Sequence, residues 1–199
     1  MNRVITIGRE FGSGGRELGQ RLAEVLGIAY YDKEIITEIA KRTELSERYV
    51  KNIVERKPVF TFPIHVGRSF VSVNTTHVLQ SSSVYAEQCK LLKEFAEKSD
   101  CVIVGRCADY VLREYDPFRI FVYAGMDSKI ARCRARDESG EEKTDKEFKK
   151  LITSIDKNRA EYYNFYTGQT WGDKLSYDIC INTTGVDINE IAPHVAKMI

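Results

Sequence analysis

The sequence predicts one α/β domain with three layers, in which a five-stranded, mainly parallel sheet lies between helices. Five short apolar runs, rich in β-branched and aromatic residues, are separated by longer stretches with helical periodicity. The runs are apolar throughout, as in strands that are covered on both faces. The length of 199 residues corresponds to one domain spanning residues 1–199, which is long enough to bury a sizeable core.

The first strand is expected at residues 3–7, and a segment with four glycines, residues 8–15, follows it. We call this segment the glycine loop. It leads into an amphipathic helix with Leu18 and Leu22 on its apolar face, and Gly27 ends that helix. The order strand, glycine loop, helix therefore opens the domain.

A short second strand is expected at residues 29–31, and Asp32 follows it directly. Residues 58–83 are harder to interpret, because Pro58 and Pro63 stand among mixed polar and aromatic residues. A mobile loop, an insertion and an oligomer contact remain open for this segment. A loop of this length inside a compact domain is often functional.

The later elements follow the same alternation of strand and helix. Thr144 and Glu147 have the spacing of a capping box, which predicts the start of a long helix. The remaining strands are expected at 101–104, 119–124 and 177–181, and the remaining helices at 34–42, 46–57, 84–98, 127–136, 144–166 and from 187 onward.

Charge and cysteine usage narrow the possible functions. Thirty basic and 29 acidic side chains leave a net charge of +1, which argues against a generic nucleic-acid binder. Five cysteines without CxxC spacing and three scattered histidines argue against a disulfide framework or a structural zinc site. No apolar run reaches the roughly 18–20 residues that span a bilayer. We expect a cytoplasmic protein with no nucleic-acid or membrane partner.

The glycine loop carries the strongest chemical signal. Glycines allow successive backbone N–H groups to point at an anion, and the following helix N-terminus adds partial positive charge, so phosphate is the expected ligand. The match to the pattern G-x-x-x-x-G-K-[ST] is incomplete. With Gly14 as the second glycine, Arg9 takes the first glycine position, Gly15 the lysine position and Arg16 the hydroxyl position. A tight turn without ligand is the alternative.

Several motifs in order resemble the cytidylate kinase-like P-loop kinases, a branch of the nucleoside monophosphate kinases. The matching segments are Phe11-Gly12-Ser13-Gly14, Tyr31-Asp32-Lys33, Val104-Gly105-Arg106, the strand 119–124 with Lys129, Arg132, Arg134 and Arg136 after it, Asp156-Lys157-Asn158-Arg159, and 177–190. The chain departs from the family pattern at three points. Gly15 replaces the phosphate lysine, Glu17 replaces the magnesium-binding hydroxyl, and Cys107 replaces an aspartate, with Asp109 two residues on.

The resemblance implies a P-loop NTPase fold with a small lid at residues 127–145. It also implies ATP and Mg²⁺ as cofactors, and phosphoryl transfer to a small acceptor, of which a nucleoside monophosphate resembling CMP is the leading candidate. Two alternatives stay open: a nucleotide-binding sensor that has lost turnover, and a kinase of another small molecule with its acceptor pocket in residues 58–83. A homodimer also stays open.

Candidate site residues follow from the loop and the resemblance. The nucleotide would be bound by Gly12, Ser13, Gly14, Gly15, Arg16 and Glu17, and Glu17 would also hold the metal. The catalytic cations would be Arg16, Arg106, Arg132 and Arg136, and the acceptor would be bound by Asp32, Arg106, Asp109, Asp156 and Arg159.

Several of these residues also have a structural alternative. A surface salt bridge would explain Arg106, a helix cap would explain Asp32, and a mutual ion pair would explain Asp156 and Arg159. A solvated face would explain the basic helix at 127–136.

Overall fold

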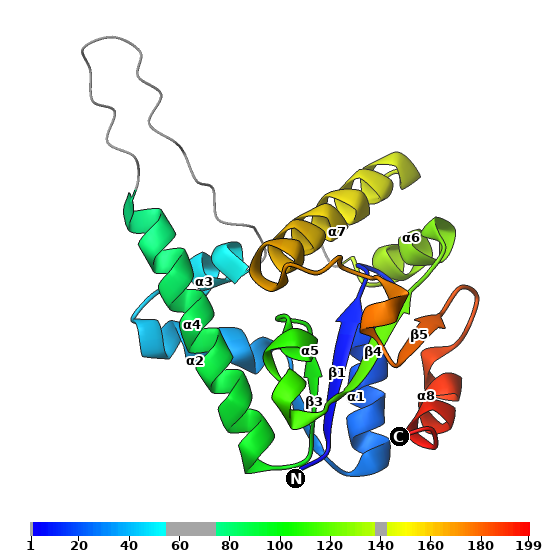
Figure 1. Cartoon of the computed structure of the whole chain (residues 1–199). Coiled ribbons are helices and arrows are strands. Elements are labelled where there is room, and N and C mark those ends of the chain that lie inside the picture. The colour runs from blue at the N-terminus through cyan, green and yellow to red at the C-terminus, as the bar shows by residue number, and fades with distance from the viewer. Residues whose placement is uncertain (1, 55–74, 138–142) are drawn as a thin grey trace.

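The computed structural model describes residues 2–54, 75–137 and 143–199. Its sheet has the strand order β2-β3-β1-β4-β5, and every neighbouring pair is parallel (Figure 1). The strands are β1 (Val4–Arg9), β2 (Ala29–Tyr31), β3 (Cys101–Val104), β4 (Phe118–Tyr123) and β5 (Ile179–Asn182). The parallel five-stranded sheet that the sequence predicts is confirmed.

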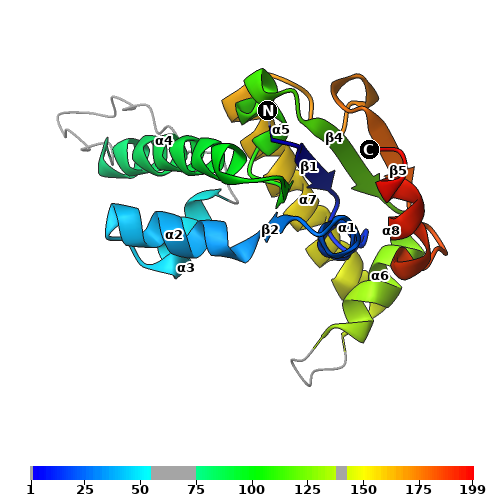
Figure 2. The same ribbon diagram turned by 90° about the horizontal axis from the view of Figure 1, so that it is seen from below.

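Helices cover both faces of this sheet. One face packs against α1 (Gly15–Leu26) and α8 (Ile188–Ala196), which lie side by side in Figure 2. The other face is covered by α2 (Lys33–Thr43), α3 (Glu47–Val54), α4 (Thr75–Lys98), α5 (Ala108–Val111) and α7 (Asp145–Thr167), while α6 (Met126–Ala135) packs on α7. Two short 3-10 turns, Arg113–Tyr115 and Lys174–Ser176, complete the elements. Among the described helices, none combines the length and apolarity that a bilayer span requires.

Helix ends follow the expected chemistry. The Thr144 hydroxyl accepts the N–H of Glu147, and the Glu147 carboxylate accepts the N–H of Thr144, so the capping box of α7 is confirmed. Gly27 ends α1 in the left-handed region, and the Asp187 carboxylate caps α8. These local signals fix the helix ends independently of the tertiary contacts.

Several element boundaries differ from those expected; β5, for example, covers Ile179–Asn182 and not residues 177–181. The strand β1 continues through Arg9, two residues past the predicted end, because Gly8 and Arg9 pair with β4. The helix α4 begins at Thr75, so residues 75–83 of the segment 58–83 are helical. Serine and threonine are weak helix formers and hide such a helix from sequence patterns, but tertiary packing overrides propensity. Residues 58–74 lie outside the described part of the chain.

The parallel strands bring their carboxyl ends to one edge of the sheet, above which α6 and α7 lie (Figure 1). The glycine loop follows β1 at this edge, and Gly105, Arg106 and Cys107 follow β3. These three residues have φ angles of 74°, 60° and 54°. Two consecutive non-glycine residues in the left-handed region are strained, and such strain concentrates at functional sites. This edge is therefore the place to look for the site.

Candidate active site

The backbone of the glycine loop requires its glycines. Gly12 and Gly14 have φ angles of 77° and 85°. A Cβ at Gly12 would lie 2.9 Å from the carbonyl oxygen of Lys129, and one at Gly14 would lie 2.8 Å from Ile188 Cδ1. Gly14 is the N-cap of α1 and supplies no side-chain hydrogen bond, so the first-turn N–H groups of α1 face the loop. This arrangement suits an anion.

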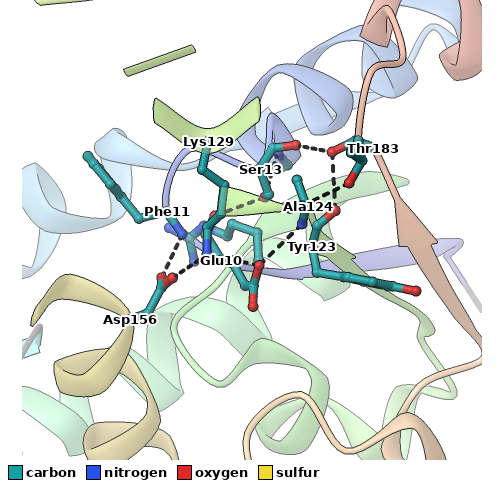
Figure 3. A network of polar contacts seen from close by, with 12 residues as sticks. Glu10, Phe11, Ser13, Tyr123, Ala124, Lys129, Asp156 and Thr183 are labelled. Atoms are coloured by element: carbon teal, nitrogen blue, oxygen red, sulfur yellow. Dashed lines mark hydrogen bonds and ion pairs between the residues drawn. The ribbon is translucent and has the colours of Figure 1, made fainter. Parts of the chain in front are cut away.

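Residues from distant parts of the chain hold the loop in place (Figure 3). The buried hydroxyl of Thr183, after β5, donates to the Ser13 carbonyl at 2.6 Å. The N–H of Phe11 donates to the Asp156 carboxylate on α7, also at 2.6 Å. Within the loop, the Ser13 hydroxyl donates to the Glu10 carbonyl at 2.8 Å. The loop is thus anchored to both α7 and the turn after β5.

Lys129 links the loop to α7 (Figure 3). Its side chain is 5% exposed, and its Nζ lies 3.0 Å from Glu10 Oε2 and 2.8 Å from Asp156 Oδ2. Burial raises the pKa of Asp156, and the hydrogen bond from Lys129 opposes that rise. Glu10 also accepts the N–H of Ala124 at 3.2 Å. The sequence placed Lys129 in the basic helix expected at 127–136, but it did not indicate this buried bridge.

Two other cations of this region also face the loop. The Arg132 guanidinium donates to the carbonyls of Ser13, Thr183 and Val186, and burial lowers its pKa. Arg136 forms an ion pair with Glu17, the predicted metal ligand. The solvated-face alternative is therefore wrong for Lys129 and Arg132, whose partners belong to the loop and its supports.

A pocket opens beside the loop, and we call it the loop pocket. Its wall combines three arginines with two phenylalanine rings, next to the backbone of the glycine loop. The lining residues are Phe11, Gly12, Arg16, Arg132, Cys133, Arg136, Asp137, Lys143, Phe148 and Leu151. Of the predicted nucleotide-binding residues, Gly12 and Arg16 thus line a pocket directly.

A second pocket lies at the end of β1, and we call it the arginine pocket. Arginines from β1, from the turn after β3 and from α7 converge there with an aspartate and aromatic rings. It is lined by Gly8, Arg9, Val54, Gly105, Arg106, Cys107, Asp109, Arg159, Tyr162, Tyr163, Trp171 and Tyr177. The structure thus brings together the predicted acceptor residues Arg106, Asp109 and Arg159. Asp32 and Asp156 do not line this pocket.

Arg9 is a member of this pocket that sequence reasoning did not select. Its side chain is 14% exposed. Burial lowers its pKa most, and repulsion from Arg159 and Arg106 lowers it further. The signal was its place at the first glycine position of the phosphate-loop pattern, where a long cation is unexpected.

Asp32 lies between two arginines. It is buried, and its carboxylate is 2.6 Å from Arg16 Nε and 4.0 Å from Arg9 Nη2. The side chain makes no cap hydrogen bond to α2. The helix-cap alternative is therefore wrong, and Asp32 serves as a counter-charge beside the loop.

In the described part of the chain, Arg106 has no surface salt bridge. Its Nη1 donates to the Val54 carbonyl at 3.4 Å, and its carbonyl accepts from Gln88 Nε2 at 3.0 Å. The Nε atom is buried and has no hydrogen-bond partner within residues 2–54, 75–137 and 143–199. Arg159 donates to the Arg9 carbonyl at 3.1 Å. Buried donors are nearly always paired in folded proteins, so an ordered water or a ligand oxygen is the expected partner of this atom.

Asp156 and Arg159 do form an ion pair, but it is long, at 3.9 Å. The shorter contacts of Asp156 go to Lys129 and to the Phe11 N–H. Asp156 thus holds the glycine loop in place through the Phe11 N–H and through Lys129.

Asp109 is a buried carboxyl group in the arginine pocket. Burial raises its pKa, and the hydroxyl of Tyr163, which donates to it at 2.7 Å, opposes that rise. The Trp171 ring packs edge-on against Phe121, with ring centroids 5.4 Å apart. The polar and aromatic walls are therefore packed against one another, and the cavity between them is small, about 50 Å³.

Comparisons with known proteins agree with this architecture. The chain is 24% identical over 199 residues to a cytidylate kinase from Thermoplasma acidophilum, covering 98% of this chain and 91% of that enzyme. A solved structure of an uncharacterised protein from Eubacterium ventriosum is 28% identical, with a TM-score of 0.71 and coverage of 99% and 98% of the two chains.

A shikimate kinase from Bacteroides thetaiotaomicron shares the fold at 16% identity and a TM-score of 0.58, with coverage of 98% and 97%. The sheet, its helices and this neighbour identify the three-layer P-loop kinase fold. The model of the cytidylate kinase-like family matches residues 4–185. The chain belongs to the cytidylate kinase-like family.

Proposed function

We propose that this protein transfers the terminal phosphoryl group of ATP to a small anionic acceptor, a nucleoside monophosphate of the cytidylate type. The observation that carries this proposal is the pair of pockets at the end of β1. The loop pocket includes Gly12 and Arg16, and the arginine pocket includes Gly8 and Arg9. A donor and an acceptor in these pockets would meet at the glycine loop. The related enzyme from Thermoplasma acidophilum is named for the same acceptor class.

The loop pocket suits the nucleotide. Gly12 and Gly14 have positive φ angles, and the N-cap Gly14 makes no side-chain hydrogen bond to the start of α1. Backbone N–H groups of the loop and of the first turn would therefore donate to phosphate oxygens. Arg16, Arg132 and Arg136 add positive charge around them. When bound, Mg²⁺ neutralises charge on the phosphates. Glu17 would be the carboxylate that holds it, and in this structure that carboxylate is ion-paired with Arg136.

The arginine pocket suits an anionic acceptor. Arg9, Arg106 and Arg159 crowd positive charge into a site where Arg9 is largely buried, and an incoming anion would relieve their repulsion. Asp109 and Tyr163 offer polar groups for a hydroxyl or a base. Phosphoryl transfer depends on positioning and charge stabilisation more than on a covalent catalyst, and these residues provide both.

A second candidate is a nucleotide-binding sensor without turnover. It is favoured by Gly15, which leaves the position of the phosphate lysine without a side chain, and by Arg132, whose guanidinium already donates to three backbone carbonyls. Such a protein would bind ATP and would form no ADP.

The test is ADP formation with ATP, Mg²⁺ and a panel of CMP, UMP, AMP, GMP and their deoxy forms. We expect acceptor-dependent ADP that falls at least tenfold in Arg106→Met and is unchanged in Arg21→Met. Arg21 is a matched control, because it is an exposed arginine of α1 paired with Glu24. ATP binding without ADP across the panel would favour the sensor, and ADP formation only with another class of anion would favour a different acceptor.

A further inference from the structure

Arg9 and Gly15 share one space beside the glycine loop. A Cβ placed on Gly15 would lie 2.5 Å from the Cβ of Arg9, 3.1 Å from its Cγ and 3.2 Å from the Cβ of Val122. The stem of Arg9 therefore passes directly over the face of Gly15. A side chain at position 15, lysine included, would collide with it.

The guanidinium of Arg9 continues from there toward β3. A Cβ on Gly105 would overlap this guanidinium, so Gly105 is a glycine both for its positive φ angle and for the space it leaves. Two glycines in different elements thus make room for one arginine. This space is filled by the side chain of a cation and not by apolar groups. We infer from this that the position of the Arg9 guanidinium is important for function.

The charge of Arg9 is poorly compensated. Within the described residues, its one ion pair is the 4.0 Å contact with Asp32, whose shorter contact is with Arg16. Arg106 and Arg159 lie in the same pocket and repel it. A cation that is 14% exposed normally has closer counter-charges, because its burial is costly without them. An anion in the pocket would supply them.

We propose that Arg9 is the cation that binds the phosphoryl group exchanged between the two pockets, in place of a lysine at position 15. The inference rests on the proposed function. In the phosphate-loop pattern the first glycine leaves room and the lysine supplies charge. Here the two positions are exchanged: Arg9 supplies the charge and Gly15 leaves the room. An arginine also offers a planar fork, which can contact two phosphate oxygens at once.

The first test removes the charge and keeps the stem. Arg9→Met is compared with Arg21→Met by calorimetry with tripolyphosphate, a probe that carries no nucleoside, and with ATP. We expect tripolyphosphate to bind at least tenfold more weakly to Arg9→Met and unchanged to Arg21→Met. Without ligand, the thermal midpoint of Arg9→Met should be equal to or above that of the wild type, because a buried repulsion is relieved. A purely structural role for Arg9 would lower this midpoint.

The second test exchanges the two positions. Gly15→Lys alone should lose both stability and tripolyphosphate binding, because its side chain meets the Arg9 stem. Arg9→Gly alone should bind weakly. The double variant Arg9→Gly/Gly15→Lys should bind tripolyphosphate at least fivefold more tightly than Arg9→Gly does.

The outcomes separate this inference from the proposed function. Wild-type tripolyphosphate affinity in Arg9→Met would overturn the inference, as would a double variant that binds no better than Arg9→Gly. Binding that depends on Arg9 in a protein that forms no ADP would support the inference while the proposed function fails. ADP formation that is unchanged in Arg9→Met would leave the proposed function standing and overturn the inference.

Discussion

Replacing Lys129 by methionine tests the buried bridge behind the glycine loop. The Lys129 side chain is 5% exposed and bonds Glu10 and Asp156, whose side chains are 28% and 15% exposed. Breaking a buried pair by removing one partner costs about 3–5 kcal/mol. Because water screens part of the Glu10 charge, we expect Lys129→Met to lower the free energy of unfolding by about 3 kcal/mol, the lower end of this range. For a domain of this size the thermal midpoint should fall by about 6–12 °C.

The loss should also depend on pH. Burial already raises the pKa of Asp156, and Lys129→Met removes a hydrogen bond that lowers it, so the pKa rises further. A carboxyl group whose pKa is higher in the folded state holds its proton more tightly there. The free energy of unfolding therefore falls as the pH rises from about 4, which is the pKa of the unfolded carboxyl group, to the pKa of the folded one. Above the folded pKa this contribution is constant. The deficit of the variant should be smaller at pH 5 than at pH 8.

Urea unfolding at pH 5 and pH 8 measures both effects. Lys150→Met is the control, since Lys150 is an exposed lysine of α7. A loss of unfolding free energy below about 1 kcal/mol at pH 8 would match an exposed ion pair. It would refute the argument that Lys129 forms a buried bridge. A deficit that grows toward pH 5 would refute the assignment of the pH dependence to Asp156.

Three further changes test the packing around the loop. Thr183→Val removes the hydroxyl that donates to the Ser13 carbonyl, so urea unfolding should show a loss of about 1–3 kcal/mol; wild-type stability would contradict the anchor. Gly105→Ala places a Cβ against the Arg9 guanidinium at a φ angle of 74°, and we expect a loss of about 1–3 kcal/mol by the same measurement, together with weaker tripolyphosphate binding; an unchanged affinity would show that Arg9 is not displaced. Thr144→Ala removes the N-cap of α7 and should cost about 1 kcal/mol by thermal unfolding, with ADP formation unchanged; a large loss of activity would mean that the cap also shapes the site.

Local patterns predicted most of the fold. Apolar runs marked the strands, and cap residues such as Thr144 and Gly27 marked helix ends, because both depend on neighbouring residues in the chain. The start of α4 at Thr75 escaped prediction, since serine and threonine carry weak helix propensity and the helix depends on packing. The strand order likewise depends on contacts between distant segments.

The candidate site was predicted unevenly for the same reason. The glycine loop was visible because its glycines are adjacent in sequence and their conformation is local. The bridge from Lys129 to Asp156 was not visible, because 27 residues separate its ends. Nor could spacing show that Asp32 pairs with Arg16 and not with its own helix end.

The sequence alone thus determined an α/β domain with a glycine loop for an anion and a set of basic residues after later strands. Only the tertiary structure decided which of those basic residues meet, and where. Arg9 crosses over Gly15 and reaches Gly105, which is 96 positions further along the chain. Propensity and periodicity act over a few residues, whereas the path of a buried side chain depends on every segment that packs around it.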